Sequence, residues 1–181
     1  MCMGGLLLLG SGMGGTNQVV AVPQMNNIDL SNPEPNYAED PDACAQLVRR
    51  VDSAIGKPPR VKMIAVEAEA RTAIFQVEVG DREMDTVLFS WGNVVRTPVE
   101  LNELERKALG SQLMTITESH MRELPAMYDR AQKEYGEGAK PGQAYLVTVP
   151  APAMWRVTVK SDRREAKTYK FTPDGSFKGE D

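Results

Sequence analysis

Residues 73–79 read Ala-Ile-Phe-Gln-Val-Glu-Val, and residues 153–159 read Ala-Met-Trp-Arg-Val-Thr-Val. Every second residue of both stretches is apolar and Gln76, Glu78, Arg156 and Thr158 fall between them, a pattern typical of a strand with one buried face. The two stretches are 80 residues apart. The same offset pairs Gly56 with Gly136 and Arg50 with Arg130. We therefore predict that one structural unit occurs twice in this chain.

Each unit is expected to contain one helix followed by three strands. In the first unit Asp40 is a suitable N-cap, Pro41 suits the first helical position, and Gly56 ends the helix. The strands of this unit are expected at 61–68, 73–79 and 86–91. The second unit is expected to have its helix at about 126–135 and its strands at about 145–149, 155–160 and 167–171.

A long helix is expected between the two units. Thr97-Pro98 is a start signal, and apolar residues then recur at spacings of three and four as far as Leu124, where Pro125 should interrupt the helix. Strands that follow one another closely should pair antiparallel. The predicted fold is therefore α+β, with two tandem αβββ units that have antiparallel sheets and are joined by a long inserted helix. The expected divisions are 1–39, 40–96, 97–124 and 125–181.

The first 28 residues carry no charge and include a run of four leucines, Leu6 to Leu9. They resemble the apolar part of a secretion signal without its basic start, which predicts an exported, periplasmic or otherwise extracytoplasmic protein whose residues 1–22 could associate with a membrane. The alternative is that these residues form only a flexible head. Residues 10–15 match G-x-G-x-x-G, but no amphipathic helix or second strand follows, so a dinucleotide site is not expected. The proline-rich segment 22–41 is expected to be a linker, with the folded part starting near Asp40.

The composition argues against several functional classes. With 41% hydrophobic residues, 25% charged residues and a net charge of −4, the chain is an ordinary globular protein without the basic face of a nucleic-acid binder. Cys2 and Cys44 are poorly placed for a framework disulfide, and Cys44 is expected to pack as a small apolar residue. Cysteine and histidine do not cluster at metal-ligand spacing, so we expect neither a metal nor a cofactor.

The candidate binding residues lie on the solvent faces of the expected strands. They are Gln76, Glu78, Arg156, Thr158 and Lys160, together with Trp91 at a strand end. Trp155 is expected in the core because of its position in the repeat. His120, with Glu118 and Glu123 nearby, could act as a general base, but it also falls on the apolar stripe of the expected long helix, which favours a packing role.

Two tandem helix-plus-three-strand units after an export-like head resemble PepSY-type domains and the β-lactamase-inhibitor-protein type of fold. The likeness is clearest in residues 155–159 and 171–177. It implies a non-catalytic envelope protein that inhibits or modulates a protein partner through the exposed, concave sheet face. The first hypothesis is such an exported binding module. The alternatives are an accessory subunit of a larger envelope assembly, attached through residues 22–41 and the uncharged head, and a small enzyme that uses His120. The oligomeric state stays open.

Overall fold

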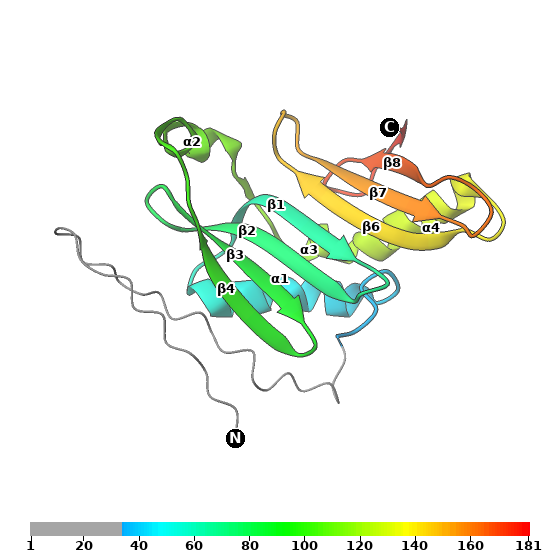
Figure 1. Cartoon of the computed structure of the whole chain (residues 1–181), viewed down its shortest axis with the longest axis horizontal. Coiled ribbons are helices and arrows are strands. Elements are labelled where there is room, and N and C mark those ends of the chain that lie inside the picture. The colour runs from blue at the N-terminus through cyan, green and yellow to red at the C-terminus, as the bar shows by residue number, and fades with distance from the viewer. Residues whose placement is uncertain (1–33) are drawn as a thin grey trace, which may run out of the picture.

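The computed structural model describes residues 34–181 and has an α+β fold built on a single nine-stranded sheet, in which every neighbouring pair is antiparallel. The strand order is β4-β3-β2-β1-β6-β7-β8-β9, and the short β5 pairs with β1 (Figure 1). The first part of the chain forms α1 (Pro41–Ile55), β1 (Arg60–Glu67), β2 (Thr72–Gly80), β3 (Glu83–Ser90) and β4 (Asn93–Val99). The last part forms α4 (Leu124–Tyr135), β6 (Lys140–Val147), β7 (Met154–Lys160), β8 (Lys167–Phe171) and β9 (Phe177–Glu180).

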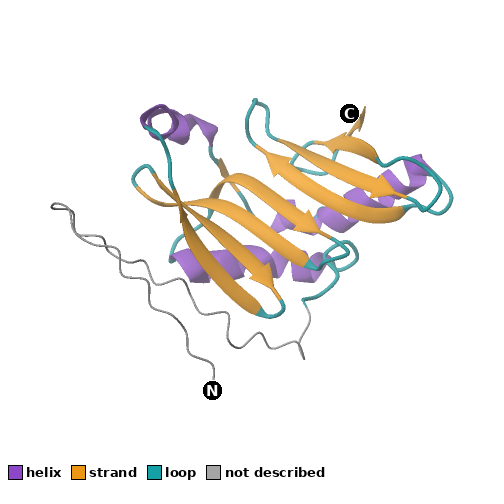
Figure 2. Cartoon of the chain, viewed as in Figure 1, coloured by secondary structure: helices purple, strands orange, loops and turns teal. Residues whose placement is uncertain are grey.

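Helices α1, α3 (Glu118–Arg122) and α4 lie on one face of the sheet (Figure 2). The core fills the space between them and the strands, and its largest fully buried side chains include Trp155, Phe75, Phe89, Leu47 and Tyr128. Trp155 is completely buried, which confirms its expected core position. The opposite side of the sheet, called the outer face from here on, is free of these three helices.

Helix α1 begins and ends where the sequence predicts. The carboxylate of Asp40 accepts hydrogen bonds from the backbone N–H groups of Asp42 and Ala43, and Pro41 occupies the first turn. Gly56 ends the helix in the left-handed region at φ 75°, a conformation that costs a glycine little because it has no Cβ. Pro125 likewise lies in the first turn of α4, where the missing N–H removes no helical hydrogen bond.

The expectation of separate sheets was wrong, because β1 and β6 pair with each other and join all the strands into one sheet. Ile64 lies opposite Leu146, and Ala65 lies opposite Tyr145. Both strands are apolar on both faces near their centres, at 63–66 and 144–147. A strand of this composition is suited to the middle of a sheet, with neighbours on both sides.

Helices α1 and α4 are each followed by four strands, not three, because β4 and β9 extend the sheet at its two edges. Strand β4 was missed because an edge strand lacks a regular apolar pattern, and most of its residues are exposed. It follows β3 through a two-residue turn in which Trp91 has φ 52° and Gly92 has φ 73°. Two positive φ values in succession are the mark of the tight hairpin turn that matches the twist of its strands.

The long helix predicted between the units does not form. In its place, residues after β4 form α2 (Glu103–Ala108), the 3-10 helix η1 (Leu109–Gln112), β5 (Met114–Thr115) and α3. Asn102 starts α2 with a capping box, and Gly110 and the β-branched Thr115 and Thr117 follow closely. These residues favour short elements, because glycine and threonine have low helix propensity and the side chains of Asn102 and Thr117 bond to nearby backbone groups in place of a continuing helix. Met84, Leu101 and Leu109 form a separate small core under this segment.

The folded part begins before Asp40. Tyr37 has no exposed surface and Glu34 is buried, so the end of the segment expected to be a linker is packed against the domain. The export-like head, the G-x-G-x-x-G stretch and most of the expected linker lie outside the described residues. Between residues 34 and 181, no helix combines the length and the apolar composition that a membrane crossing requires.

Candidate functional site

The outer face has an apolar centre formed by two cross-strand rows of side chains. Neighbours in each row lie directly opposite one another in the register of the sheet. The first row consists of Val95, Leu88, Ile74, Ala65 and Tyr145, and the second contains Gln76, Met63, Val147 and Met154. All of these residues are partly exposed, in contrast to the fully buried residues between them along each strand.

A shallow hollow of about 310 Å³ lies where β1, β2 and β6 meet. Ala65 provides the smallest side chain on this part of β1, and Ile74 and Tyr145 stand on either side of it. Glu67 and Gln143 add polar groups. The hollow therefore offers an apolar floor with hydrogen-bonding groups at its border, a combination suited to receiving a side chain from another protein.

One end of the outer face is covered by the α2 and η1 segment. Met84 shares a face of β3 with Thr86 and Leu88, and it packs under Leu101 and Leu109. At this end Glu78 forms ion pairs with Arg60 at 2.9 Å and Lys57 at 3.8 Å. Glu78 is therefore a fixed charge at the border of the apolar centre, whereas Gln76, two residues earlier, lies within the second row.

Arg156 and Thr158 lie on the other side of the apolar centre, on β7. Arg156 is opposite Tyr145 and forms an ion pair with Asp181 at 2.9 Å. The ammonium group of Lys170, together with Arg156, lowers the pKa of Asp181. The hydroxyl of Thr158 lies 3.0 Å from that of Thr168. These side chains are held by neighbours on β8 and at the C-terminus, so their positions on the face are defined.

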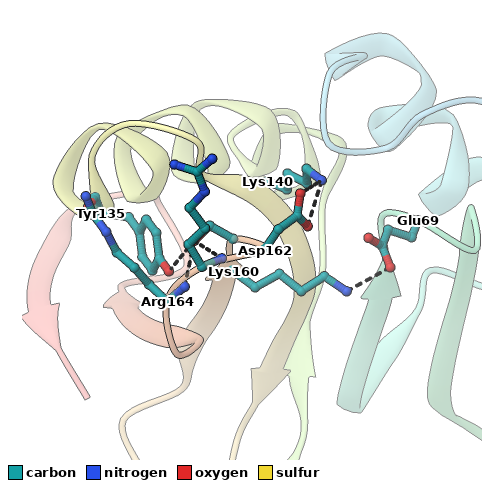
Figure 3. Close-up of polar contacts among 8 residues, drawn as sticks. Glu69, Tyr135, Lys140, Lys160, Asp162 and Arg164 are labelled. Atoms are coloured by element: carbon teal, nitrogen blue, oxygen red, sulfur yellow. Dashed lines mark hydrogen bonds and ion pairs between the residues drawn. The ribbon is translucent and has the colours of Figure 1, made fainter.

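Lys160 connects the two halves of the sheet. Its ammonium group reaches from β7 to the carboxylate of Glu69, in the turn after β1, at 2.8 Å (Figure 3). Glu69 raises the pKa of Lys160 through this hydrogen bond. Close by, Lys140 binds Asp162 at 2.8 Å. Lys160 therefore marks the loop end of the outer face and takes part in a contact between residues that are distant in sequence.

Trp91 lies at the same loop end and is 42% exposed. It lines a hollow of about 200 Å³ together with Glu34, Glu69, Ala70 and Arg71. Glu69 thus contacts Lys160 and also borders the hollow of Trp91. The six predicted residues therefore fall into three places. Gln76 lies within the apolar centre, with Arg156 and Thr158 beside it on β7. Trp91 and Lys160 mark the loop end, and Glu78 lies at the covered end.

A buried carboxylate, that of Glu34, fixes the hairpin turn of Trp91 and Gly92. Glu34 accepts hydrogen bonds from Arg50 at 2.6 and 2.9 Å, from the backbone N–H of Gly92 at 3.0 Å and from the hydroxyl of Tyr37. Burial alone would raise the pKa of Glu34, but the hydrogen bonds from Arg50 and Tyr37 outweigh it and hold the pKa below the ordinary 4.5. Residues 34–40 are called the arm from here on. The arm, α1 and the hairpin turn therefore share one hydrogen-bond network.

His120 does not lie on the apolar stripe of a long helix, because that helix is absent. It is the third residue of α3, where its Nδ1 accepts a hydrogen bond from the N–H of Thr117 at 3.3 Å. Glu118 is bound by Arg49 through two contacts of 2.7 Å. The His120 side chain therefore caps α3 itself, whereas Glu118 fixes α3 to α1 through Arg49. Residues 34–181 hold no group of three or more acidic, cysteine or histidine side chains arranged for a metal ion.

Cys44 is buried in α1, as expected for a small apolar residue, and its Sγ lies 3.0 Å from the carbonyl oxygen of Tyr37. Burial raises the pKa of this thiol to about 12. A thiol with so high a pKa is a poor nucleophile near neutral pH. Its position supports packing between the arm and α1.

Sequence reasoning missed the residues at the centre of the face, namely Met63, Ala65, Tyr145 and Val147. A signal was present, since 63–66 and 144–147 are runs of four residues without charge in which both faces of the strand are apolar. Such runs are typical of strands that are buried on both faces, so they mark the outer face as apolar at these positions. What the sequence did not indicate was that β1 and β6 pair with each other.

Comparisons with known proteins give a fold likeness only. No protein-family model matches the chain, and no curated protein matches it. The crystal structure of a putative lipoprotein from Clostridium difficile 630 is similar, with a TM-score of 0.53 and 11% identity over 75% of this chain and 89% of that one. At this identity the likeness concerns the arrangement of helices and strands, which is shared over most of both chains.

Proposed function

We propose that this chain is a non-enzymatic, exported binding module that holds a protein partner on the outer face of its sheet and thereby inhibits or modulates that partner. The observation that carries the proposal is the apolar centre on a sheet face free of α1, α3 and α4. An uncovered antiparallel sheet normally exposes polar residues. Here Leu88, Ile74, Ala65 and Tyr145 follow one another across four strands on that face.

The composition of the face fits a protein interface. Interfaces combine an apolar, aromatic-containing centre with a polar border, and a few central side chains provide most of the affinity. Tyr145 and Ile74 would form the centre, and Arg156, Lys160 and Glu78 the border. Since the border charges are already fixed by ion pairs, a partner would meet a largely preformed surface, which reduces the entropic cost of binding.

We infer an envelope location for this module. Two observations support it: the uncharged, leucine-containing head at residues 1–28, and the likeness of the fold to a putative lipoprotein. The alternative of an accessory subunit in an envelope assembly draws support from the arm. Glu34 and Tyr37 bind its end to α1 and the Trp91 turn, so an attachment made through preceding residues would be coupled to the folded domain.

We further infer that the chain arose by duplication of one unit of a helix and its following strands. Strands β1 and β6 have bounds that differ by 80 residues, and Gly56 and Gly136 follow the two helices. Arg50 lies over the ring of Phe89 at 4.5 Å, and its counterpart Arg130 lies over Phe177 at 5.0 Å. An alignment of homologues in which the two units of one chain resemble each other more strongly would test this inference.

The binding function can be tested by purifying the tagged full chain from its native cells. The wild-type chain is expected to retain a partner that Ile74→Asp loses. The control is Leu104→Asp, which removes an apolar side chain that is 77% exposed on α2 and belongs to neither row of the apolar centre. Circular dichroism confirms folding of each variant. If both variants retained the partner equally, the outer face would be excluded as the binding surface. Recovery of the wild-type chain without a partner would argue against a binding module.

A further inference from the structure

Among residues 34–181, strand β4 forms one edge of the sheet and pairs on one side with β3. The turn of Trp91 and Gly92 is a two-residue hairpin turn, so its flanking residues, Ser90 and Asn93, form a hydrogen-bonded pair. Hydrogen-bonded and non-hydrogen-bonded pairs then alternate along the hairpin. The backbone groups of Val94, Arg96 and Pro98 therefore point away from β3, toward the open edge.

The edge offers a defined set of backbone groups. Val94 and Arg96 provide N–H donors and carbonyl acceptors, whereas Pro98 provides only a carbonyl because it has no N–H. Proline at such an outward position is the usual way in which a protein limits strand pairing at an edge. The part of β4 available for pairing is therefore short and extends from the turn to Arg96. Val94 is 47% exposed there.

A groove of about 590 Å³ lies beside this edge, between β4 and α1. Ala54 and Val94 provide apolar surface, and Arg49, Arg50 and Arg96 surround it. Val94 and Arg96 occupy the helix side of β4, since Val95 between them lies on the outer face. A strand added to β4 would place every second side chain into this groove. The groove thus lies on the helix side of the sheet and is separate from the outer face.

The exposed charge of the groove is positive although each arginine has an acidic partner. The side chains of Arg49, Arg50 and Arg96 are 67%, 32% and 43% exposed. Their partners Glu118, Glu34 and Asp85 are only 36%, 2% and 10% exposed. The carboxylates of Glu34 and Asp85 therefore lie beneath their arginines, and Glu118 is less exposed than Arg49, so an approaching molecule meets mainly guanidinium groups.

We propose that β4 is a strand-addition site for an extended, acidic segment of a partner protein. The segment pairs its backbone with Val94 and Arg96 and directs alternate carboxylates toward Arg49 and its neighbours in the groove. Backbone pairing gives affinity and the side chains in the groove give selectivity, as in other cases of strand addition. A second copy of this chain is a poorer occupant, because pairing two β4 edges would bring both sets of arginines together.

The test uses the full-length chain and two synthetic peptides, each about seven residues long to match β4. Glutamate alternates with valine in the first peptide, and lysine replaces glutamate in the second. Binding is followed by fluorescence anisotropy and by backbone amide shifts. We expect the glutamate peptide to bind and to shift the amide signals of Val94 and Arg96, and the lysine peptide to show no binding.

Two variants with matched controls separate the backbone and charge contributions. Val94→Pro removes an outward N–H and is expected to weaken glutamate-peptide binding about tenfold, whereas Val94→Ala keeps that N–H and the pairing. Arg49→Ala should weaken binding about fivefold, and Arg163→Ala, an exposed arginine outside the groove, should leave it unchanged.

The proposal would be overturned by failure of the glutamate peptide to bind, by equal binding of the lysine peptide, or by amide shifts confined to the outer face. A dimer in analytical ultracentrifugation that Val94→Pro dissociates would assign this edge to a second copy and also overturn it. The peptide test reads only β4 and its groove. A negative result there therefore does not bear on binding at the outer face, and a negative result at the outer face does not bear on β4.

Discussion

Ala65 of β1 lies directly opposite Tyr145 of β6, and this pair stands at the join between the first and last parts of the chain. Directly opposite residues in an antiparallel sheet have Cα atoms about 5 Å apart, within the range for a disulfide. We predict that Ala65→Cys combined with Tyr145→Cys, in a Cys2→Ser background, forms a disulfide on mild oxidation. Mass spectrometry of the oxidised protein measures it.

The matched control combines Ala65→Cys with Val147→Cys. Val147 lies opposite Met63, so this pair is diagonal and more widely separated. The diagonal pair should form far less disulfide. Equal yields from both pairs, or no disulfide from the direct pair, would contradict the register of β1 and β6 and with it the single continuous sheet.

Neighbouring residues on β2 should differ sharply in their effect on stability. Phe75 is fully buried and its ring meets that of Phe89 edge-on at 5.9 Å, whereas Ile74 lies on the outer face. We expect Phe75→Ala to lower the free energy of unfolding by about 4 kcal/mol, and Ile74→Ala by about 1 kcal/mol. Urea unfolding of the two variants gives both values. Similar losses would mean that the outer face is packed against something within this chain.

The network around Glu34 predicts a pH dependence of stability. The pKa of Glu34 is lower in the folded state than its ordinary value of 4.5, so the folded protein binds fewer protons there than the unfolded chain. Its stabilising effect is therefore complete well above pH 4.5 and is lost as the pH falls through the folded-state pKa. We expect Glu34→Gln to lower the free energy of unfolding by about 3 kcal/mol at pH 7, and by clearly less at pH 3.

Unfolding curves of the wild type and Glu34→Gln at the two pH values measure this difference. Glu39→Gln is a suitable control because Glu39 is an exposed carboxylate on the same arm. It should leave the pH dependence unchanged. A difference between wild type and Glu34→Gln that stays constant from pH 7 to pH 3 would contradict a lowered pKa of Glu34 in the folded protein.

Cys44 should resist thiol reagents in the folded protein. Burial raises its pKa to about 12 from an ordinary value of 9.0, so only about one thiol in 10⁴ is ionised at pH 8. We expect the Cys2→Ser variant to react with a thiol reagent only when urea unfolds it. Rapid labelling of the folded variant would instead show that the arm residue Tyr37 leaves α1 readily.

The elements predicted best from the sequence are those determined by local signals. Asp40, Pro41 and Gly56 define α1 because caps act on their own helix, and the alternation at 73–79 defines β2. The edge strand β4 and the segment after it were not predicted, because their apolar residues do not all pack against the same part of the core. Leu101 and Leu109 pack on Met84, whereas Leu104 is exposed, and the sequence alone presents all three as one helical stripe.

The candidate site was predicted in part, mostly at its border. Gln76, Arg156 and Lys160 were identified from alternation within one strand, and they lie on the outer face as that alternation requires. Its centre depends on the pairing of β1 with β6, a contact between residues about 80 positions apart. Local periodicity does not specify which strands become neighbours, so Tyr145 and Ala65 could be placed together only by the structure.

The most direct test of the outer-face binding function is site-specific photo-crosslinking in the native cells. A photoreactive residue is placed either at Tyr145 on the outer face or at Asp129, an exposed residue of α4 on the opposite side. We predict that Tyr145 yields a cross-linked complex with a different protein and that Asp129 does not, and that Ile74→Asp abolishes the complex. Cross-links from Asp129 alone, or from both positions equally, would contradict the proposal that this face holds the partner.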